Sequence, residues 1–222
     1  MTSTMKSEIS CNFSILLNGD LVITKRLLDF INGRRVIAVD GGIRHADTLG
    51  IIPELWIGDF DSSNDTLLER WKFIERVSYI PEKNKTDSEI AINKALEMNA
   101  KSILLIGAFS GQRFDHALQH LMLSMSLINR NIQIILTSGN EEAFILTPGK
   151  QSFDLPPGSL FSVIALSDIE GLTIFGARYL LNNFFLPFGS SRTLSNNVEK
   201  EITIMIKKGH AFLLCRPYDY LN

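Results

Sequence analysis

The chain has 222 residues, of which 45% are hydrophobic and 21% charged, the profile of a soluble globular protein with one large or two small domains. Its net charge of −2 and its lack of a basic tract argue against a nucleic-acid surface. The first ten residues lack an apolar signal core, and no apolar run approaches the roughly 20 residues of a membrane span, so we expect a cytoplasmic protein. Cys11 and Cys215 are the only cysteines, and we expect both to be reduced.

The first two thirds of the chain alternate between short apolar runs and amphipathic stretches. The runs predict buried strands over residues 13–17, 36–39, 55–57, 103–106 and 132–136. The amphipathic stretches predict helices over residues 23–31, 65–73, 88–98 and 115–128. This alternation is typical of βα units, so we expect residues 1–140 to form a mostly parallel, Rossmann-like α/β domain. Such a sheet carries its ligand loops at the carboxyl ends of its strands.

The pattern changes at about residue 140. From Glu141 onward, glycines and prolines interrupt short apolar segments, of which we expect 160–166, 171–174, 203–206 and 211–215 to be strands. We therefore predict a small antiparallel β-sandwich or barrel domain over residues 141–222. The polar segments 171–173, 176–179 and 195–197 are expected to be turns.

The segment Gly58-Asp59-Phe60-Asp61-Ser62 follows the third predicted strand. In an extended segment, residues two apart point to the same side, so Asp59 and Asp61 would share a face while Phe60 points into the core. Carboxylate oxygens so placed suit Mg²⁺. A solvated turn after a buried strand is the alternative interpretation.

Asp40-Gly41-Gly42 follows the second predicted strand. Paired glycines allow a backbone to approach a ligand closely and to offer N–H groups to a phosphate. Asp40 adds a carboxylate that could hold a metal-bound water or a substrate hydroxyl. An ordinary tight turn is the alternative.

The segment from Lys83 to Asp87 precedes a predicted helix. Thr86 or Asp87 could cap this helix. Asp87 could also be a third metal-directed carboxylate, and Lys83 a counter-charge for phosphate. The two interpretations are compatible if the helix starts at the ligand edge of the sheet.

Residues 107–116 connect a predicted strand and helix. Arg113 offers a planar fork for phosphate oxygens, which Asp115 could orient; alternatively, Asp115 is the helix N-cap. His116 and His120 have the spacing of a zinc pair, but the sequence offers no third ligand, so we expect His120 to be structural. Trp56 and Trp71 are expected in the core or an interface.

Taken in order, these segments resemble the thiamine pyrophosphokinase family over nearly the whole chain. The resemblance is carried by Leu17-Asn18-Gly19, Val39-Asp40-Gly41-Gly42, residues 49–53, Gly58-Asp59-Phe60-Asp61-Ser62, Lys83 with Thr86-Asp87, residues 111–116, residues 176–179 and Ser195-Asn196. It implies an α/β domain, a β domain and a homodimer whose active sites lie between the α/β domain of one subunit and the β domain of the other.

The implied reaction transfers diphosphate from ATP to thiamine and releases AMP, with Mg²⁺. By position, the resemblance makes Asp59, Asp61 and Asp87 the metal ligands, with Asp40 beside them as a catalytic carboxylate. It assigns nucleotide binding to Asn18, Gly19, Gly41, Gly42, Lys83, Thr86, Arg113 and Asp115, and thiamine binding to Ser195 and Asn196.

The chain departs from the family pattern at four places. Ile43-Arg44-His45 replaces Ala-Asn-Arg, Asn84 replaces an Asp, Gln112 replaces a Gly and Asn197 replaces a Glu. These changes affect the fit of the nucleotide and the orientation of thiamine rather than the class of reaction. Two rival functions remain: a diphosphokinase for another acceptor, such as a hydroxymethylpterin, and a nucleotide or thiamine sensor without activity. The three proposed metal carboxylates argue against a sensor.

Overall fold

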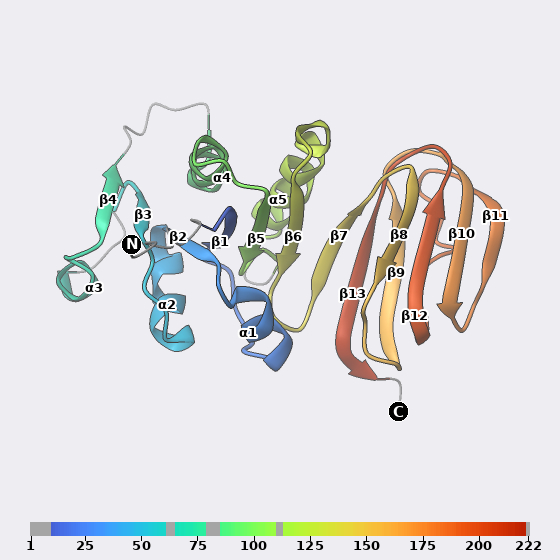
Figure 1. Cartoon of the computed structure of the whole chain (residues 1–222), viewed down its shortest axis with the longest axis horizontal. Helices are drawn as coiled ribbons and strands as arrows, with labels where there is room; N and C mark the ends of the chain where they lie inside the picture. Colours follow the sequence, from blue (N-terminus) through green and yellow to red (C-terminus); the bar gives the residue numbers. More distant parts are fainter. Residues whose placement is uncertain (1–9, 61–64, 79–84, 110–112, 221–222) are drawn as a thin grey trace, which may run out of the picture.

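The computed structural model describes residues 10–60, 65–78, 85–109 and 113–220, and its architecture is mixed α/β (Figure 1). The first half contains six strands that pair in parallel in the order β6-β5-β1-β2-β3-β4. Their bounds are β1 (Asn12–Leu16), β2 (Arg35–Val39), β3 (Leu55–Gly58), β4 (Glu75–Ser78), β5 (Ser102–Ile106) and β6 (Gln133–Thr137). The parallel sheet that the sequence predicts is therefore present.

Helices cover both faces of this parallel sheet. They are α1 (Lys25–Ile31), η1 (Asp40–Ile43), α2 (Arg44–Leu49), α3 (Asp65–Arg70), α4 (Asp87–Glu97), α5 (Phe114–Ser126) and η2 (Ile128–Arg130). Figure 1 shows α1 and α2 on one side of the sheet and α4 and α5 on the other. No helix within the described ranges is long and apolar enough to cross a membrane.

Alternation along the strands explains why the predicted runs are apolar throughout. Ile15 packs in a core cluster with Ile90 and Ala91 of α4, whereas the next residue, Leu16, packs in a cluster with Leu27 of α1 and Ala46 of α2. Both faces are thus buried, and a strand buried on both faces needs apolar residues at every position. Trp56 and Trp71 belong to the second cluster, as predicted for core residues.

The second half of the chain contains β7 (Glu142–Leu146), β8 (Gly149–Phe153), β9 (Ser159–Ala165), β10 (Ile169–Ala177), β11 (Leu181–Leu186), β12 (Asn196–Ile206) and β13 (Ala211–Tyr220). All pairings among these strands are antiparallel. β12 pairs with β9 at its start and with β8 and β10 further along. A separate apolar cluster, which includes Phe161, Val163 and Ile204, forms the core of this half.

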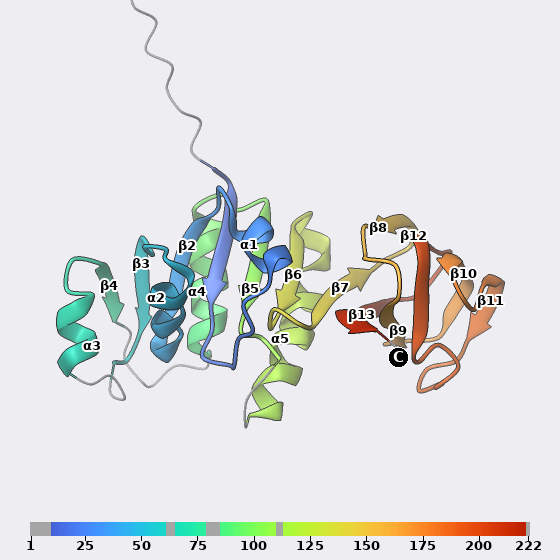
Figure 2. The same cartoon turned by 90° about the horizontal axis from the view of Figure 1, so that it is seen from below.

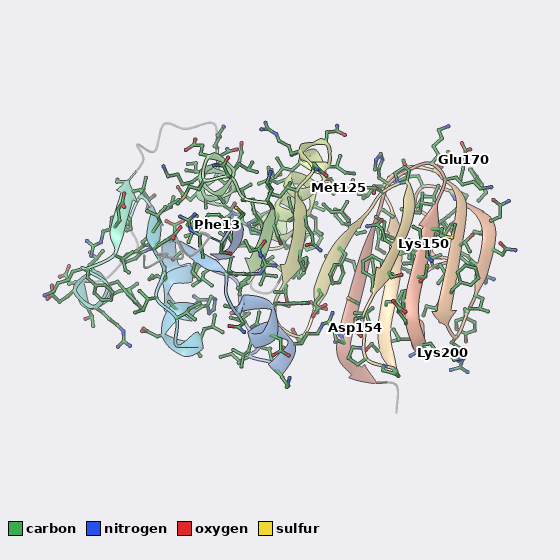
Figure 3. All side chains as sticks on the ribbon, in the orientation of Figure 1. Phe13, Met125, Lys150, Asp154, Glu170 and Lys200 are labelled. Atoms are coloured by element: carbon green, nitrogen blue, oxygen red, sulfur yellow. The ribbon has the colours of Figure 1, made fainter. Side chains whose placement is uncertain are left out.

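The two halves share one sheet. β7 pairs antiparallel with β6 on one side and with β13 on the other, so the 13-stranded sheet of the described residues runs through the predicted domain boundary. Figure 2 shows β7 bridging the two groups of strands. Side chains fill the space between sheet and helices, and Phe13 lies within the first half, whereas Lys150, Glu170 and Lys200 lie in the second (Figure 3). The limits 1–140 and 141–222 stay a prediction.

The predicted turns at 171–173 and at Gly176-Ala177 are wrong, because both lie inside β10. Gly176 has a φ of 79°, and the pairing of β10 with β12 shifts register beside it. The glycine therefore marks a β-bulge rather than a turn. Asn196 and Asn197 likewise begin β12. Cys11 and Cys215 are not joined by a disulfide, and their reduced state stays a prediction.

Candidate active site

A cavity of about 350 Å³ lies at the carboxyl ends of β1, β2 and β5 and at the first turns of α4 and α5. This is the sheet edge where the sequence predicts a ligand site. Its lining includes the predicted residues Asn18, Gly19, Asp40, Thr86, Asp87 and Arg113, together with Leu17, Val39, Ser88, Gly107, Ala108, His116, Ala117 and His120. Asp61 and Lys83 lie outside the described residues.

Asp40 is fixed at the wall of the cavity by unusual backbone geometry. Its φ is 44°, a conformation that few residues other than glycine adopt, and its carbonyl accepts a hydrogen bond of 2.9 Å from Trp56 Nε1. The Asp40 carboxyl group packs directly over Gly58, where a Cβ would overlap Oδ1. That oxygen is buried and has no hydrogen-bond partner. Gly58 therefore provides the space that Asp40 occupies.

Three carboxyl groups converge here. The pKa of Asp40 is raised to about 7, first by burial, then by the negative charge of Asp87 and then by that of Asp59. A side-chain hydrogen bond with Asp87 also raises this pKa, whereas a hydrogen bond from the Asp59 backbone lowers it. Converging carboxylates are stabilised either by a proton or by a cation. The unpaired oxygen of Asp40 and its acidic neighbours fit a divalent cation.

The described carboxylates do not form a complete metal site by themselves. Within the described ranges, no group of three or more His, Cys, Asp or Glu side chains has the geometry to hold a metal ion. Mg²⁺ usually takes only one or two protein carboxylates and completes its shell with water and substrate phosphates. Asp59 and Asp87 therefore fit a Mg²⁺ ion that is also bound by phosphate, and the ligand set with Asp61 stays a prediction.

Phe60 differs from the sequence expectation. Its φ is 62°, so the backbone at Phe60 is not extended, and the extended geometry assumed in predicting a shared face for Asp59 and Asp61 is wrong there. Asp61 itself lies outside the described residues. The Phe60 ring still packs toward the core, with its centroid 4.9 Å from that of Trp56. The ring anchors this loop through an aromatic contact rather than through strand alternation.

The start of α4 settles the choice between capping residues. Thr86 is the N-cap, and its hydroxyl accepts a hydrogen bond of 3.3 Å from Glu89 N. Asp87 is the first helical residue, beside the positive end of the helix dipole, and faces the cavity. One residue thus caps the helix and the next supplies the carboxylate.

Arg113 and Asp115 form a bidentate ion pair at the start of α5, with distances of 2.9 and 2.7 Å. The hydrogen bonds from Arg113 lower the pKa of Asp115 to about 2. Arg113, rather than Asp115, occupies the N-cap position of α5, and no side-chain hydrogen bond caps this helix. Asp115 is therefore not the N-cap, and its ion pair with Arg113 is compatible with the predicted orienting role, which stays a prediction.

His116 and His120 line the cavity, although the sequence assigned them no ligand role. The ring of His120 is buried, and its Nδ1 lies 3.2 Å from the Ala108 carbonyl, which requires Nδ1 to donate. Burial lowers the pKa of His120, so the ring is neutral at pH 7. The structural role predicted for His120 is confirmed. Its i, i+4 spacing with His116 was the signal that both residues share one helix face.

Gly41 and Gly42 are predicted to contact the nucleotide, but neither lines the cavity. A Cβ on Gly41 would lie 2.9 Å from Asn18 Cγ, and a Cβ on Gly42 would lie 2.7 Å from the Leu16 carbonyl carbon. The glycines therefore allow η1 to pack against the end of β1. Their close approach is to the protein's own backbone and to Asn18.

Ser195 and Asn196 lie away from this cavity. Ser195 lines a second, mainly apolar cavity of about 600 Å³ between α5 and the strands β9 and β13, whose walls include Phe114 and Leu118. The Asn196 side chain is buried and accepts from Tyr179 N and Asn197 N while donating to Tyr179 O. The Asn196 side chain thus holds the backbone of Tyr179 and Asn197 in place. Of the two predicted thiamine contacts, Ser195 is the one that lines a cavity.

Parallel strands that end in a cavity lined by carboxylates and an arginine define a mixed α/β protein with a candidate ligand site at the carboxyl edge of its sheet. Residues 30–136 match the family model "Thiamin pyrophosphokinase, catalytic domain", and residues 150–210 match "Thiamin pyrophosphokinase, vitamin B1 binding domain". The chain belongs to the thiamin pyrophosphokinase family and is an enzyme of that family.

Individual relatives agree with this assignment. Thiamine pyrophosphokinase of Bacillus subtilis (strain 168) is 32% identical over 169 residues, which cover 73% of this chain and 77% of that protein. The crystal structure of a Bacillus subtilis thiamine pyrophosphokinase matches with a TM-score of 0.84 at 26% identity, covering 94% of this chain and 100% of the other. Thiamin pyrophosphokinase from Candida albicans has the same fold at 14% identity, with a TM-score of 0.77 and coverage of 93% and 88%.

Proposed function

We propose that this chain transfers diphosphate from ATP to the hydroxyl of thiamine, using the cavity at the carboxyl ends of β1, β2 and β5. The observation that carries the proposal is the convergence of Asp59 and Asp87 on Asp40, beside a cavity that Asp40, Asp87 and Arg113 line. Acidic groups collected at a site for polyanionic ATP make chemical sense only with a bridging cation. Mg²⁺, held by Asp59, Asp87 and Asp61, would supply charge neutralisation when bound.

The hydroxyl oxygen of thiamine attacks the β-phosphorus in line. A bond forms between that oxygen and the β-phosphorus. The bond between the β-phosphorus and the oxygen that bridges it to the α-phosphorus breaks, and its electron pair leaves with AMP. Arg113 offsets the negative charge on the phosphate oxygens, and Asp115 orients the guanidinium plane of Arg113. Asp40 and Asp61 are the two candidates for accepting the hydroxyl proton, and Asp40 lines the cavity.

We further propose a cytoplasmic homodimer in which the antiparallel second half acts as a β-sandwich that binds thiamine. Three apolar side chains on one face of α5 are exposed: Phe114 (77%), Leu118 (45%) and Met122 (39%). Their i, i+4, i+8 spacing makes a continuous stripe beside the second cavity, the kind of surface that association with another copy covers. Light scattering of Leu118→Glu against the unmodified chain tests the dimer, with a shift to monomer expected.

One assay tests the reaction. The protein is mixed with ATP, Mg²⁺ and thiamine, and AMP and thiamine diphosphate are measured by chromatography, in parallel with a hydroxymethylpterin as acceptor. Formation of both products with thiamine alone is expected. Turnover with the pterin alone would show that the pterin, and not thiamine, is the acceptor. Binding of ATP and thiamine without release of AMP would indicate a sensor. Asp87→Asn is the matched control, in which turnover should fall about 10²-fold or more.

A further inference from the structure

The loop at the end of β1, which contains Asn18 and Gly19, is held by hydrogen bonds from α2, on the side of the sheet opposite to α4 and α5. Asn18 and Gly19 line the cavity, and their carbonyl groups accept hydrogen bonds from α2. Arg44 Nη2 donates to Asn18 O at 2.8 Å and to Gly19 O at 3.3 Å. His45 Nε2 lies 2.8 Å from Gly19 O, and because a carbonyl only accepts, this nitrogen carries the proton.

These hydrogen bonds fix the direction of two peptide groups. In a trans peptide the C=O of one residue and the N–H of the next point in opposite directions. Carbonyls drawn toward α2 therefore turn the N–H groups of Gly19 and Asp20 away from it, toward the side of the sheet that carries α4 and α5 (Figure 1). The cavity opens on that side. Neither N–H donates a hydrogen bond to another residue in the described part of the chain.

Two further contacts keep the loop in this position. Gly107 follows β5 with a φ of 75°, and a Cβ there would lie 2.8 Å from Leu17 O and 3.1 Å from Gly19 O, so only glycine fits without displacing the loop. His45 itself is buried, whereas Arg44 is exposed and lies 4.0 Å from Asp20 Oδ1. The Gly19 peptide is thus packed against Gly107 and held by the two donors Arg44 and His45.

We propose that Arg44 and His45 are positioning residues for the nucleotide: they orient the peptides of Asn18 and Gly19 so that two backbone N–H groups face the phosphates of ATP. The inference rests on the proposed nucleotide site. It gives a role to two of the residues at which the chain departs from its family. Neither side chain touches the substrate in this role, so their loss weakens ATP binding and leaves the thiamine site intact.

The test measures binding and turnover separately. The binding probe is α,β-methylene-ATP with Mg²⁺. It keeps three phosphorus groups but cannot be cleaved between the α- and β-phosphorus, where the reaction breaks ATP. Calorimetry gives its Kd. In Arg44→Ala we expect Kd for the probe and KM for ATP to rise about tenfold, equivalent to about 1.4 kcal/mol, with KM for thiamine unchanged. His45→Gln, which keeps an N–H donor, should bind the probe more tightly than His45→Leu.

Arg70→Ala is the matched control, because Arg70 also bonds α2, through Asp47, but does not touch the loop. Unchanged Kd in a folded Arg44→Ala protein, or an equal rise in Arg70→Ala, would overturn the inference. A wild-type protein that neither binds the probe nor releases AMP from ATP would overturn the nucleotide site and this inference with it. Thermal unfolding of each variant separates loss of fold from loss of positioning.

Discussion

Replacing Gly58 by alanine tests whether the position of Asp40 matters for turnover. The added methyl would lie 3.1 Å from Asp40 Cγ and would overlap Oδ1. A carbon and an oxygen in contact are normally about 3.3 Å apart or more, so the carboxyl group must move by about 1 Å. Misplacement of a reacting group by about 1 Å can lower the rate about 10²-fold. We expect Gly58→Ala to lower kcat/KM by this factor.

The fold should survive this change. Gly58 does not have a positive φ, so alanine introduces no backbone strain, and overpacking at one site costs about 1–3 kcal/mol. The assay is steady-state release of AMP, together with thermal unfolding. Gly50→Ala is the stability control, because Gly50 has a φ of 65° with no atom within 4 Å of an added Cβ. It should lose stability through strain and keep its turnover.

A double-mutant cycle locates the effect. If the methyl acts through Asp40, Gly58→Ala should lower turnover in the native background and add little in an Asp40→Ala background. Normal turnover in Gly58→Ala would refute the role of Asp40. An equal further loss in the double variant would show that the methyl acts elsewhere.

Four further variants probe the remaining contacts. The Glu142 side chain is 1% exposed and forms an ion pair of 2.6 Å with Arg26, so Glu142→Ala removes a buried partner of this arginine and should lower the free energy of unfolding by about 3–5 kcal/mol in urea titration. Asn196→Ala should destabilise the fold, whereas Ser195→Ala should raise KM for thiamine without changing the melting temperature. Burial lowers the pKa of His120 below 6.5, so the native state binds fewer protons than the unfolded state, and stability should fall as pH drops below 6.5, less so in His120→Asn.

Burial explains why most of the fold could be predicted. The strands expected in the first half are mostly buried on both faces and therefore read as apolar runs, as in Ser102–Ile106. β4 was missed because its side chains are exposed or only half-buried, and β11 because exposed asparagines interrupt it. α2 was missed because it has only six residues and continues directly from η1. Apolar periodicity cannot mark elements that bury so little.

The sequence also predicts which residues of the candidate site lie near one another, but not the backbone conformation of those residues. Topology brings the ends of parallel strands together, so Asp40 and Asp87 could be placed near one another from their positions in the chain. The positive φ values of Asp40 and Phe60 could not, because each depends on contacts with residues distant in sequence, among them Trp56 and Gly58. Local sequence does not encode such contacts, and the extended geometry assumed for Phe60 failed for this reason.

The position of α5 bears on where thiamine reaches ATP. His116 and His120 of α5 face the first cavity, whereas Phe114 and Leu118 face the second, where Ser195 lies. Within one chain, α5 therefore separates Ser195 from Asp87. An acceptor held at Ser195 reaches the β-phosphorus more directly if Ser195 belongs to another copy, which supports the proposed shared active site.

Mixing two inactive variants tests this arrangement. Asp87→Asn removes the carboxylate from the first cavity, and Ser195→Arg places a bulky cation against the thiazolium of thiamine. If sites are shared, a mixed dimer has one intact site and one doubly altered site, so a fully exchanged 1:1 mixture, half of it mixed dimers, should recover about a quarter of the native activity. If each chain builds its own site, every site carries one defect and the mixture stays inactive. Recovery that increases with time of subunit exchange, and is absent from either variant alone, would therefore place Ser195 of one chain opposite Asp87 of another.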